Sequence, residues 1–426
     1  MSTATPPEIL YIDAFEAESE WADPLAYRVH PVLAKASGPR RELAGVLNLM
    51  CRAGDRFSLA AVASPQAIDH WESAGLKGRA AVAVAESEGA TVSADICVRA
   101  FAATKLAADR ATALCARLDS PPLAIVRDVN AKQWSQRLRE AMGFAMGALV
   151  SGPNELAAVA AALDNGQGIV VKEDHGVSGR GNAVIDTRRS YERLRRLVEV
   201  QQAQGARGPL IVEPLLDIAV DFSGHIDVAV NGSITFLGLR RTINDQGRYV
   251  ASTALAAPLA DEVLATGYAA VMADVGHALF AAGYHGPASI DSALLSDGLI
   301  VPILEINARM SMGSIALHDE CNRAREGDPS ALVKLAIDPT NDAPKRIMSA
   351  VTAIGPSRVA VLNPDAISIS GKSFAMLAIR FNLEAGLSAT IQALSDALLA
   401  NGLTTDLHRF ADAICAPQRR FERLRL

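Results

Sequence analysis

An apolar run that opens into a glycine-rich loop constrains this chain more than any other segment. Residues 168–173 read Gly-Ile-Val-Val-Lys-Glu, which is typical of a buried strand, and Asp-His-Gly-Val-Ser-Gly-Arg-Gly follows at 174–181. Glycine accepts unusual backbone angles and leaves room beside the chain, so such a loop can turn its N–H groups toward a polyphosphate. Lys172 adds a positive charge. We predict a phosphate-binding loop here, with an ordinary glycine-rich hairpin tip as the alternative.

A second segment, residues 288–308, carries hard oxygen ligands on an apolar background. Asp291, Glu305 and Asn307 are the residue types that hold Mg²⁺ on a nucleotide. Two acids on one sheet face repel each other unless a cation lies between them, and the neutral Asn307 limits that repulsion. The sequence therefore predicts a magnesium site, with a solvated sheet face carrying two acids as the alternative.

The hairpin loop at 296–298 decides whether these acids can meet. A three-residue loop places Asp291 opposite Ile303, with Glu305 as its diagonal neighbour on the same face. A two-residue loop would place the two acids on opposite faces. The metal site thus requires the three-residue loop or an equivalent bulge.

Composition bounds the class of protein. The chain has 426 residues, of which 50% are hydrophobic, and its net charge is −6. It is long enough for two or three globular domains. We expect no nucleic-acid surface, because no basic face interleaved with aromatic residues is evident. No run of 18 apolar residues occurs in the sequence, so we expect no membrane span. The five scattered cysteines suit a reducing cytoplasm. Neither they nor the histidines have zinc-site spacing.

The pattern along the chain predicts an α/β and α+β multidomain protein. Strands alternate with helices in residues 1–105, which we expect to be an α/β domain. Residues 106–340 follow as a central domain, with one subdomain at about 140–209 and a second at about 210–340. Residues 341–426 form a small α+β domain.

Within these domains, several elements can be assigned from local patterns. Asn231-Gly232 lies between two apolar runs and predicts a hairpin. We expect strands at 123–128 and 347–354, and one long helix at 261–282.

The ordered set of motifs resembles the ATP-grasp superfamily of carboxylate–amine ligases, over about residues 100–330. The residues that carry the resemblance are, in order, Val170-Val-Lys-Glu with Gly176-Val-Ser-Gly-Arg-Gly, Val212-Glu-Pro-Leu, Asp221, Ser289-Ile-Asp and Leu304-Glu-Ile-Asn-Ala-Arg309. The N-terminal domain resembles a pre-ATP-grasp domain. With its extra C-terminal domain, the chain is most similar to natural-product peptide ligases of the pheganomycin type.

The resemblance implies a role for each motif. It implies that ATP is contacted by Lys105, Lys172, Gly176, Ser178, Gly179, Gly181, Glu213, Pro214, Leu215 and Asp221. Lys172 would contact the phosphates, and so would Lys105, for which a solvated helix position is the alternative. Residues 176–181 would form a mobile lid. Glu213 would meet the adenine amino group, or else form a strand-end salt bridge.

Two of the implied contacts carry alternatives of their own. Asp221 stands where the family often has a glutamate that binds the ribose, and its shorter side chain is a departure. Ser178 would donate to a phosphate or merely occupy a turn.

The resemblance also implies the metal ligands Asp291, Glu305 and Asn307, with Arg309 near the γ-phosphate. From the residues alone, Arg309 could hold a phosphate, an acyl group or one of the acids. Arg240 or Arg241 could bind a substrate carboxylate through a bidentate fork, or be an exposed strand-end charge.

His175 and His285 suggest structural or solvent-facing positions rather than general bases. The implied reaction joins a small-molecule carboxylate and an amine through an acylphosphate, using ATP and Mg²⁺. Alternatives are a carboxylate–thiol ligase, a phosphoryl-transferring member and a non-catalytic nucleotide-binding module. A homodimer is compatible with the apolar N-terminal domain.

Overall fold

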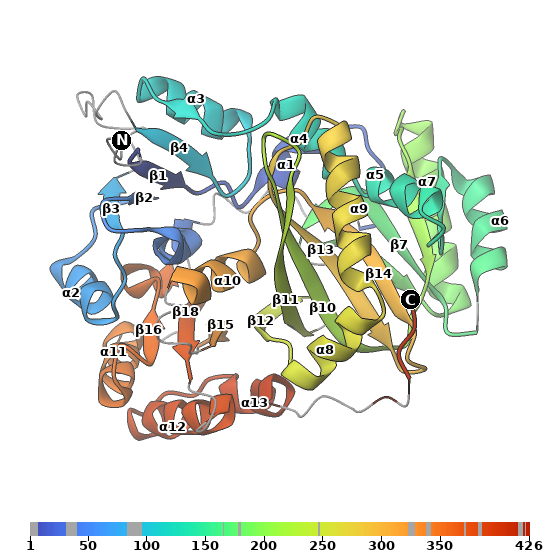
Figure 1. Ribbon diagram of the computed structural model, residues 1–426. Coiled ribbons are helices and arrows are strands. Elements are labelled where there is room, and N and C mark those ends of the chain that lie inside the picture. The colour runs from blue at the N-terminus through green and yellow to red at the C-terminus, as the bar shows by residue number, and fades with distance from the viewer. Residues whose placement is uncertain are drawn as a thin grey trace.

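The described residues form three sheets, each built from strands that are consecutive in the sequence (Figure 1). The computed structural model of the protein describes residues 7–30, 41–82, 96–164, 166–177, 180–245, 248–322, 329–337, 342–369, 372–381, 386–415, 421 and 423–426.

The first sheet is parallel, and its strand order reverses beside β1. The order is β3-β2-β1-β4-β5, so the chain moves outward from β1 and then returns to its other side with β4. The carboxyl ends of β1 and β4 therefore flank a topological switch point. The elements of this unit are β1 (Ile9–Ile12), α1 (Ala17–Trp21), the 3-10 helix η1 (Arg41–Met50), β2 (Arg56–Leu59), α2 (Pro65–Ser73), β3 (Arg79–Val82), β4 (Cys97–Ala100), α3 (Lys105–Ala113) and β5 (Arg117–Leu118).

Two short helices, α4 (Leu123–Val129) and α5 (Lys132–Ala141), lead to a second sheet, which is antiparallel. Its order is β6-β9-β7-β8, and α6 and α7 pack against it. The strands β7 and β8 form a hairpin that carries the predicted phosphate loop, and Ser178 and Gly179 lie outside the described residues. The bounds are β6 (Ala148–Val150), α6 (Pro153–Leu163), β7 (Ile169–Val177), β8 (Arg180–Ile185), α7 (Arg188–Ala203) and β9 (Leu210–Pro214).

The third sheet is the largest and runs in the order β14-β13-β10-β11-β12-β15-β18-β16, with β17 beside β18. The helix α9 covers the part formed by β10 and β11 (Figure 1). The bounds are β10 (Ile218–Val228), β11 (Ile234–Asp245), β12 (Arg248–Ala254), α8 (Ala257–Ala265), α9 (Tyr268–Ala281), β13 (Gly286–Leu295), β14 (Ile300–Asn307), α10 (Met312–Asn322), β15 (Ser330–Ala336), α11 (Ala343–Ile354), β16 (Val359–Val361), the 3-10 helix η2 (Pro364–Ala366), β17 (Ser368–Ile369), β18 (Lys372–Arg380), α12 (Gly386–Ala400) and α13 (Leu407–Cys415).

Three of the expected elements are wrong. Residues 123–128 form helix α4, which begins directly after a proline pair. Residues 347–354 belong to helix α11, where Ile347, Ala350 and Val351 are buried at helical spacing. The long helix at 261–282 is two helices, α8 and α9, separated at Gly267, whose φ of +92° favours glycine. The hairpin at Asn231-Gly232 is confirmed.

The sheets do not divide the chain at the expected domain boundaries. The first sheet continues to Leu118, past residue 105. The strand β15 bridges the expected C-terminal unit to the large sheet, because it pairs with both β12 and β18. The C-terminal unit is thus an extension of the central sheet, although it has its own cluster of buried apolar side chains.

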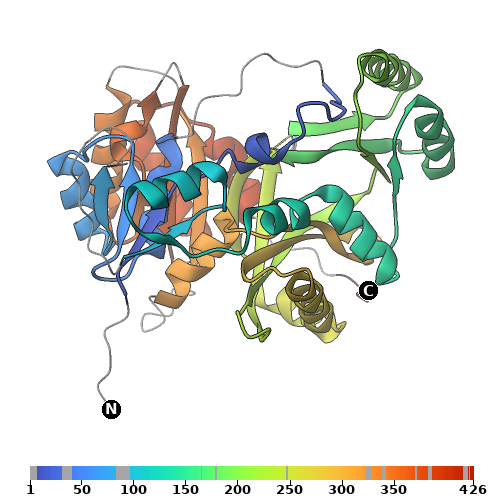
Figure 2. The ribbon, with the colours of Figure 1, turned by 90° about the horizontal axis from the view of Figure 1, so that it is seen from above.

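The N-terminal and C-terminal units contact each other directly. In the view from above they lie together at one end of the molecule (Figure 2). The second sheet, which carries the predicted lid and is called the lid sheet below, lies at the other end. The indole of Trp71 donates to the carbonyl of Val361 at 3.1 Å, and the Val361 N–H donates to His70 Nε2 at 2.9 Å. No single helix among the described residues is long and apolar enough to cross a membrane; the pair α8 and α9 together meet such a criterion but are bent by 68°.

Candidate active site

Helix α5 presents polar rather than apolar side chains to the interior. Lys132, Ser135, Gln136 and Arg139 recur at helical spacing, and all four are buried. The Ser135 hydroxyl accepts the N–H of Ile306 at 3.1 Å. This helix therefore ties the acidic strand β14 to the lid sheet through hydrogen bonds and ion pairs.

The two predicted acidic residues face each other. Asp291 on β13 is the register partner of Glu305 on β14, and Ser289 is the partner of Asn307. The loop at 296–298 has three residues, because the Leu295 N–H donates to the carbonyl of Leu299. A bulge after Asp291 then shifts the register by two residues, so Glu305 replaces Ile303 as the direct partner. The expected shared face is confirmed, through the loop and the bulge together.

The charge of Asp291 is only partly compensated. Burial raises the pKa of Asp291 to about 7, and the Glu305 charge adds to the shift. Arg309 and a hydrogen bond from Asn307, whose Nδ2 lies 3.1 Å from the carboxylate, act in the opposite direction. A divalent cation between the two carboxylates would remove the repulsion.

Lys132 is a site residue that sequence reasoning missed. Its side chain is 6% exposed, and its Nζ lies 2.7 Å from Glu305 Oε1 and 3.0 Å from the carbonyl of Gly176 in the lid. The signal was present, since Lys132 is one of only eight lysines and begins the polar stripe of α5.

A cavity of about 570 Å³ lies above the acidic pair. Lys172 and Asn182 reach it from the lid, and Arg309 reaches it from the segment after β14. Its floor is one face of the large sheet, which contributes Asp221, Ser223, Thr242, Asn244, Ser252, Ser289, Asp291, Glu305 and Asn307. We call this cavity the acidic pocket.

Lys172 and Glu213 form part of a buried ion cluster. Glu213 is 3% exposed, and its two oxygens lie 2.5 Å from Lys172 Nζ and 2.5 Å from Arg139 Nη2. Burial opposes ionisation of Glu213, but the charges of Lys172 and Arg139 outweigh it and hold the pKa of that carboxyl below its usual value. The salt-bridge alternative describes Glu213 in this structure, and its contact with the adenine amino group stays a prediction.

Neighbouring backbone groups are also engaged. The N–H of Leu215 donates to the carbonyl of Gly168 at 2.9 Å, and Pro214 pairs with Ile169. The Leu215 N–H is thus engaged within the protein, and the contacts of Pro214 and Leu215 with ATP stay predictions. Asp221 does line the acidic pocket; burial raises its pKa, while Asn244 and Arg241 lower it in part.

The three arginines differ sharply. Arg309 lines the acidic pocket, with Nη2 2.5 Å from Glu18 and 2.9 Å from Asn307 Oδ1. Arg240 is fully buried against Glu320 at 2.5 Å, so neither a substrate fork nor an exposed strand end describes it. Arg241 is the next residue on β11, so its side chain leaves the strand on the opposite face of the sheet.

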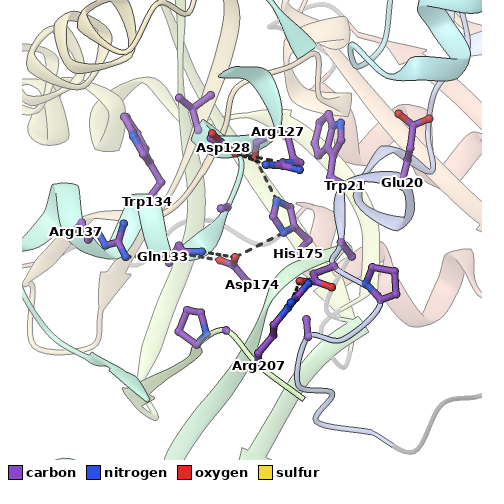
Figure 3. Close-up of a pocket in the computed structure, with 18 of the residues that line it drawn as sticks. Glu20, Trp21, Arg127, Asp128, Gln133, Trp134, Arg137, Asp174, His175 and Arg207 are labelled. Carbon is purple, nitrogen blue, oxygen red and sulfur yellow. Dashed lines mark hydrogen bonds and ion pairs between the residues drawn. The ribbon is translucent and has the colours of Figure 1, made fainter. Parts of the chain in front are cut away.

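The base of the lid is fastened from outside the lid sheet. Glu173 accepts from Arg28 at 2.8 Å. Asp174 accepts from the N–H and the side chain of Gln133, and His175 Nε2 lies 3.2 Å from the Arg127 carbonyl (Figure 3). A separate cavity of about 810 Å³ is lined by Arg28, Arg127, Gln133, Asp174 and His175. His175 thus makes a structural contact, which is one of the two positions that the sequence suggested.

The remaining predicted residues have varied positions. Gly181 has a φ of +100°, which favours glycine, and Gly176 lies at the end of β7. Lys105 is a correction: it begins helix α3, is exposed, pairs with Asp109 at 2.6 Å and does not line the acidic pocket. Lys132, which pairs with Glu305, is the lysine that lies beside the acidic pair instead. His285 lines a different cavity, which also meets Arg309.

The donor set fits Mg²⁺. Asp291, Glu305 and Asn307 offer hard oxygens on one sheet face at the floor of a cavity. No cluster of three or more His, Cys, Asp or Glu side chains suited to a metal occurs among the residues that the structure describes. The candidate site is therefore a pair of carboxylates completed by an amide.

Comparison with known proteins supports this architecture. No protein-family model matches the chain. Over 196 residues it is 26% identical to a butirosin acyl-carrier protein–L-glutamate ligase of Niallia circulans, and the match covers 45% of this chain and 46% of that protein. The chain thus spans about half the length of this curated relative.

Solved structures resemble nearly the whole chain. An ADP complex of N5-carboxyaminoimidazole ribonucleotide synthetase matches with a TM-score of 0.55 and 13% identity, covering 93% of this chain and 97% of the other. Biotin carboxylase of Campylobacter jejuni, in a β,γ-ATP complex, matches with a TM-score of 0.58 and 12% identity, and the match covers 96% of this chain and 95% of the other. The chain has the ATP-grasp fold.

Proposed function

We propose that this protein is an ATP-dependent carboxylate–amine ligase that forms an amide bond through an acylphosphate. One observation carries the proposal. Asp291 faces Glu305 on the floor of a cavity that Lys172 overhangs, and Lys132 links that floor to the lid. Within an ATP-grasp fold, such a cavity fits a nucleotide triphosphate and its metal ion.

The first step activates the acid. A carboxylate oxygen of the substrate attacks the γ-phosphorus of ATP, the bond from that phosphorus to the β,γ-bridging oxygen breaks, and ADP leaves. Lys172 lines the cavity and can offset charge on the phosphates, while Lys132 pairs with Glu305 beneath it. Mg²⁺, when bound by Asp291, Glu305 and Asn307, would neutralise further charge on the phosphate oxygens.

The second step forms the amide. The amine nitrogen, as the free base, attacks the acyl carbon, the bond from that carbon to the phosphate oxygen breaks, and the nitrogen's proton passes to the departing phosphate. Arg309 lies at the end of the acidic strand, where it can orient the acyl oxygen. The fastened lid base would help to keep water from the acylphosphate.

A trapping assay tests this function. The protein is incubated with ATP, Mg²⁺ and each of the common amino acids as acid, with hydroxylamine as acceptor, and ADP and hydroxamate are measured. The expected result is hydroxamate formed in equal amount to ADP for at least one acid. ADP release without any acyl product would instead indicate a phosphoryl-transferring or hydrolytic enzyme.

A carboxylate–thiol ligase is the second candidate. The observation in its favour is the relative whose name joins L-glutamate to an acyl-carrier protein. Replacing hydroxylamine by a thiol such as N-acetylcysteamine separates the two, because the product is then a thioester rather than an amide. We further propose that the acid and the amine are intermediates of peptide natural-product biosynthesis and that the reaction takes place in the cytoplasm.

A further inference from the structure

A second cavity, of about 500 Å³, lies at the switch point of the N-terminal sheet. Tyr11 on β1 and Arg99 on β4 are register partners near the carboxyl ends of their strands, and both line it. In open α/β sheets, ligands bind in the crevice beyond the carboxyl ends of the strands at such a point. This cavity therefore occupies the position at which such sheets bind ligands.

The cavity adjoins the acidic pocket. Phe101 and Arg309 line both, with the guanidinium 5.7 Å from the centre of the phenyl ring. A molecule in this second cavity would therefore approach the same arginine that borders the acyl-forming site.

One strand also runs beneath both cavities. Asp221, Ser223, His225 and Asp227 alternate along β10 and share a face. Asp221 and Ser223 line the acidic pocket, and Asp227 lines the second cavity. His225 is fully buried between them under Gly313, where an added Cβ would lie 2.7 Å from the imidazole. The two cavities are successive compartments on one sheet face.

Asp227 is the unusual group in this cavity. Its carboxylate is partly buried, and among the residues that the structure describes no hydrogen bond or ion pair reaches it. Burial raises the pKa of Asp227, and Arg99 lowers it in part through its charge. Arg99 itself donates to Asp119 at 2.9 Å. A carboxylate in such a place gains most from a cation that the ligand supplies.

The rest of the lining is largely apolar or aromatic. Leu237 is 40% exposed, an uncommon position for a large apolar side chain beside a carboxylate. The other members of this lining include Tyr11, Phe101, Tyr284, Met310 and Leu317. The fitting ligand thus has an apolar body and a positively charged end.

We propose that this second cavity is the acceptor site and takes an amine with an apolar body, whose ammonium group pairs with Asp227. The inference rests on the proposed ligase function, because only in a ligase would this amine be the acceptor. In that reaction the amine is held on the far side of Arg309 from the nucleotide. The ammonium loses a proton to solvent before its nitrogen attacks the acyl carbon.

A binding experiment tests the site without any turnover. Phenethylamine and 3-phenylpropionate have similar bodies and opposite charges, and their dissociation constants are measured by ligand-detected NMR. We expect the wild-type protein to bind the amine about tenfold more tightly than the acid, and Asp227→Asn to remove that preference. Asp227→Glu should retain it, and so should Asp274→Asn, which changes an exposed carboxylate on α9. Equal binding of the two probes to wild type, no binding, or an unchanged preference in Asp227→Asn would overturn the proposal.

Trapping then separates this proposal from the proposed function. With the acid identified by the hydroxamate assay, Asp227→Asn should form hydroxamate at the wild-type rate from hydroxylamine, which is small and uncharged. Its KM for phenethylamine as acceptor should rise about tenfold. Loss of both reactions alike would place Asp227 in acid activation and reject the acceptor site. Absence of hydroxamate in wild type would reject the ligase function, while the binding preference would still decide whether Asp227 holds an amine.

Discussion

Lys132 Nζ lies 2.7 Å from the Glu305 carboxylate, and its other contact is the carbonyl of Gly176 in the lid at 3.0 Å. One buried cation therefore joins the acidic hairpin to the strand that leads into the glycine-rich loop. Any movement of the lid away from the large sheet must break or lengthen one of these two contacts. The position of the lid and the charge balance around Glu305 are thus coupled.

Glu305→Gln should lower ATP-dependent turnover by about 100-fold or more, because it removes one of two facing carboxylates and the partner of Lys132. The melting temperature should change little, because the Gln carbonyl still accepts a hydrogen bond from Lys132 and the repulsion of Asp291 is removed. Asp297→Asn, in the loop of the same hairpin, is the matched control and should be active. Full activity of Glu305→Gln would remove this residue from the site.

Lys172→Met should weaken ADP binding about tenfold, as measured by calorimetry, because a charged donor over the acidic pocket is lost. Glu213 keeps its contact with Arg139, so the fold should survive. Lys105→Met provides the comparison, because that lysine is exposed and pairs with Asp109 on its own helix. If Lys105→Met weakened binding and Lys172→Met did not, the phosphate site would lie elsewhere.

Arg240→Met should destabilise the protein by about 3 kcal/mol in urea unfolding, because it leaves Glu320 without its ion-pair partner in a largely buried place. Arg425→Met breaks an exposed pair with Asp297 and should cost below about 1 kcal/mol. An Arg240→Met protein of wild-type stability with a raised KM for the acid would restore the substrate-binding role that burial argues against.

Acid should loosen the contact between the N-terminal and C-terminal units. Burial lowers the pKa of His70 to about 4, from 6.5. The unfolded chain then takes up this proton more readily than the folded chain, so the stabilisation is present above about pH 6.5 and is lost as the pH falls toward 4. His70→Gln keeps an acceptor for the Val361 N–H without titrating. Its unfolding free energy should fall less steeply over this range; identical slopes would contradict the assignment.

The sequence was sufficient for the acidic hairpin and for the strand that leads into the glycine-rich loop, because both depend on local patterns. Alternation on β14 and the loop at 296–298 put Glu305 and Asn307 on one face and brought Asp291 to them. The bulge that makes Asp291 and Glu305 direct partners arises from pairing between strands, and no local signal specifies its position. Ser178 and Gly179 remain predictions.

Other residues depend on contacts that a single chain pattern does not encode. Lys105 and Lys132 both stand at helix starts, and only the packing of α5 against β14 distinguishes them. Arg240 and Arg241 are adjacent in sequence, and only the face of β11 decides which is buried. The prediction of a strand at 347–354 was wrong, because a run of β-branched and small residues can also form the apolar stripe of a helix.

The hydrogen bonding between β12 and β15 has a consequence for any attempt to divide this protein. A chain ending before Ser330 would leave β12 as an edge with free N–H and C=O groups, at a place where Ala251 and Ser252 are otherwise paired. Exposed strand edges recruit other strands. A shortened catalytic fragment should therefore self-associate, and the C-terminal unit acts as its permanent edge cover.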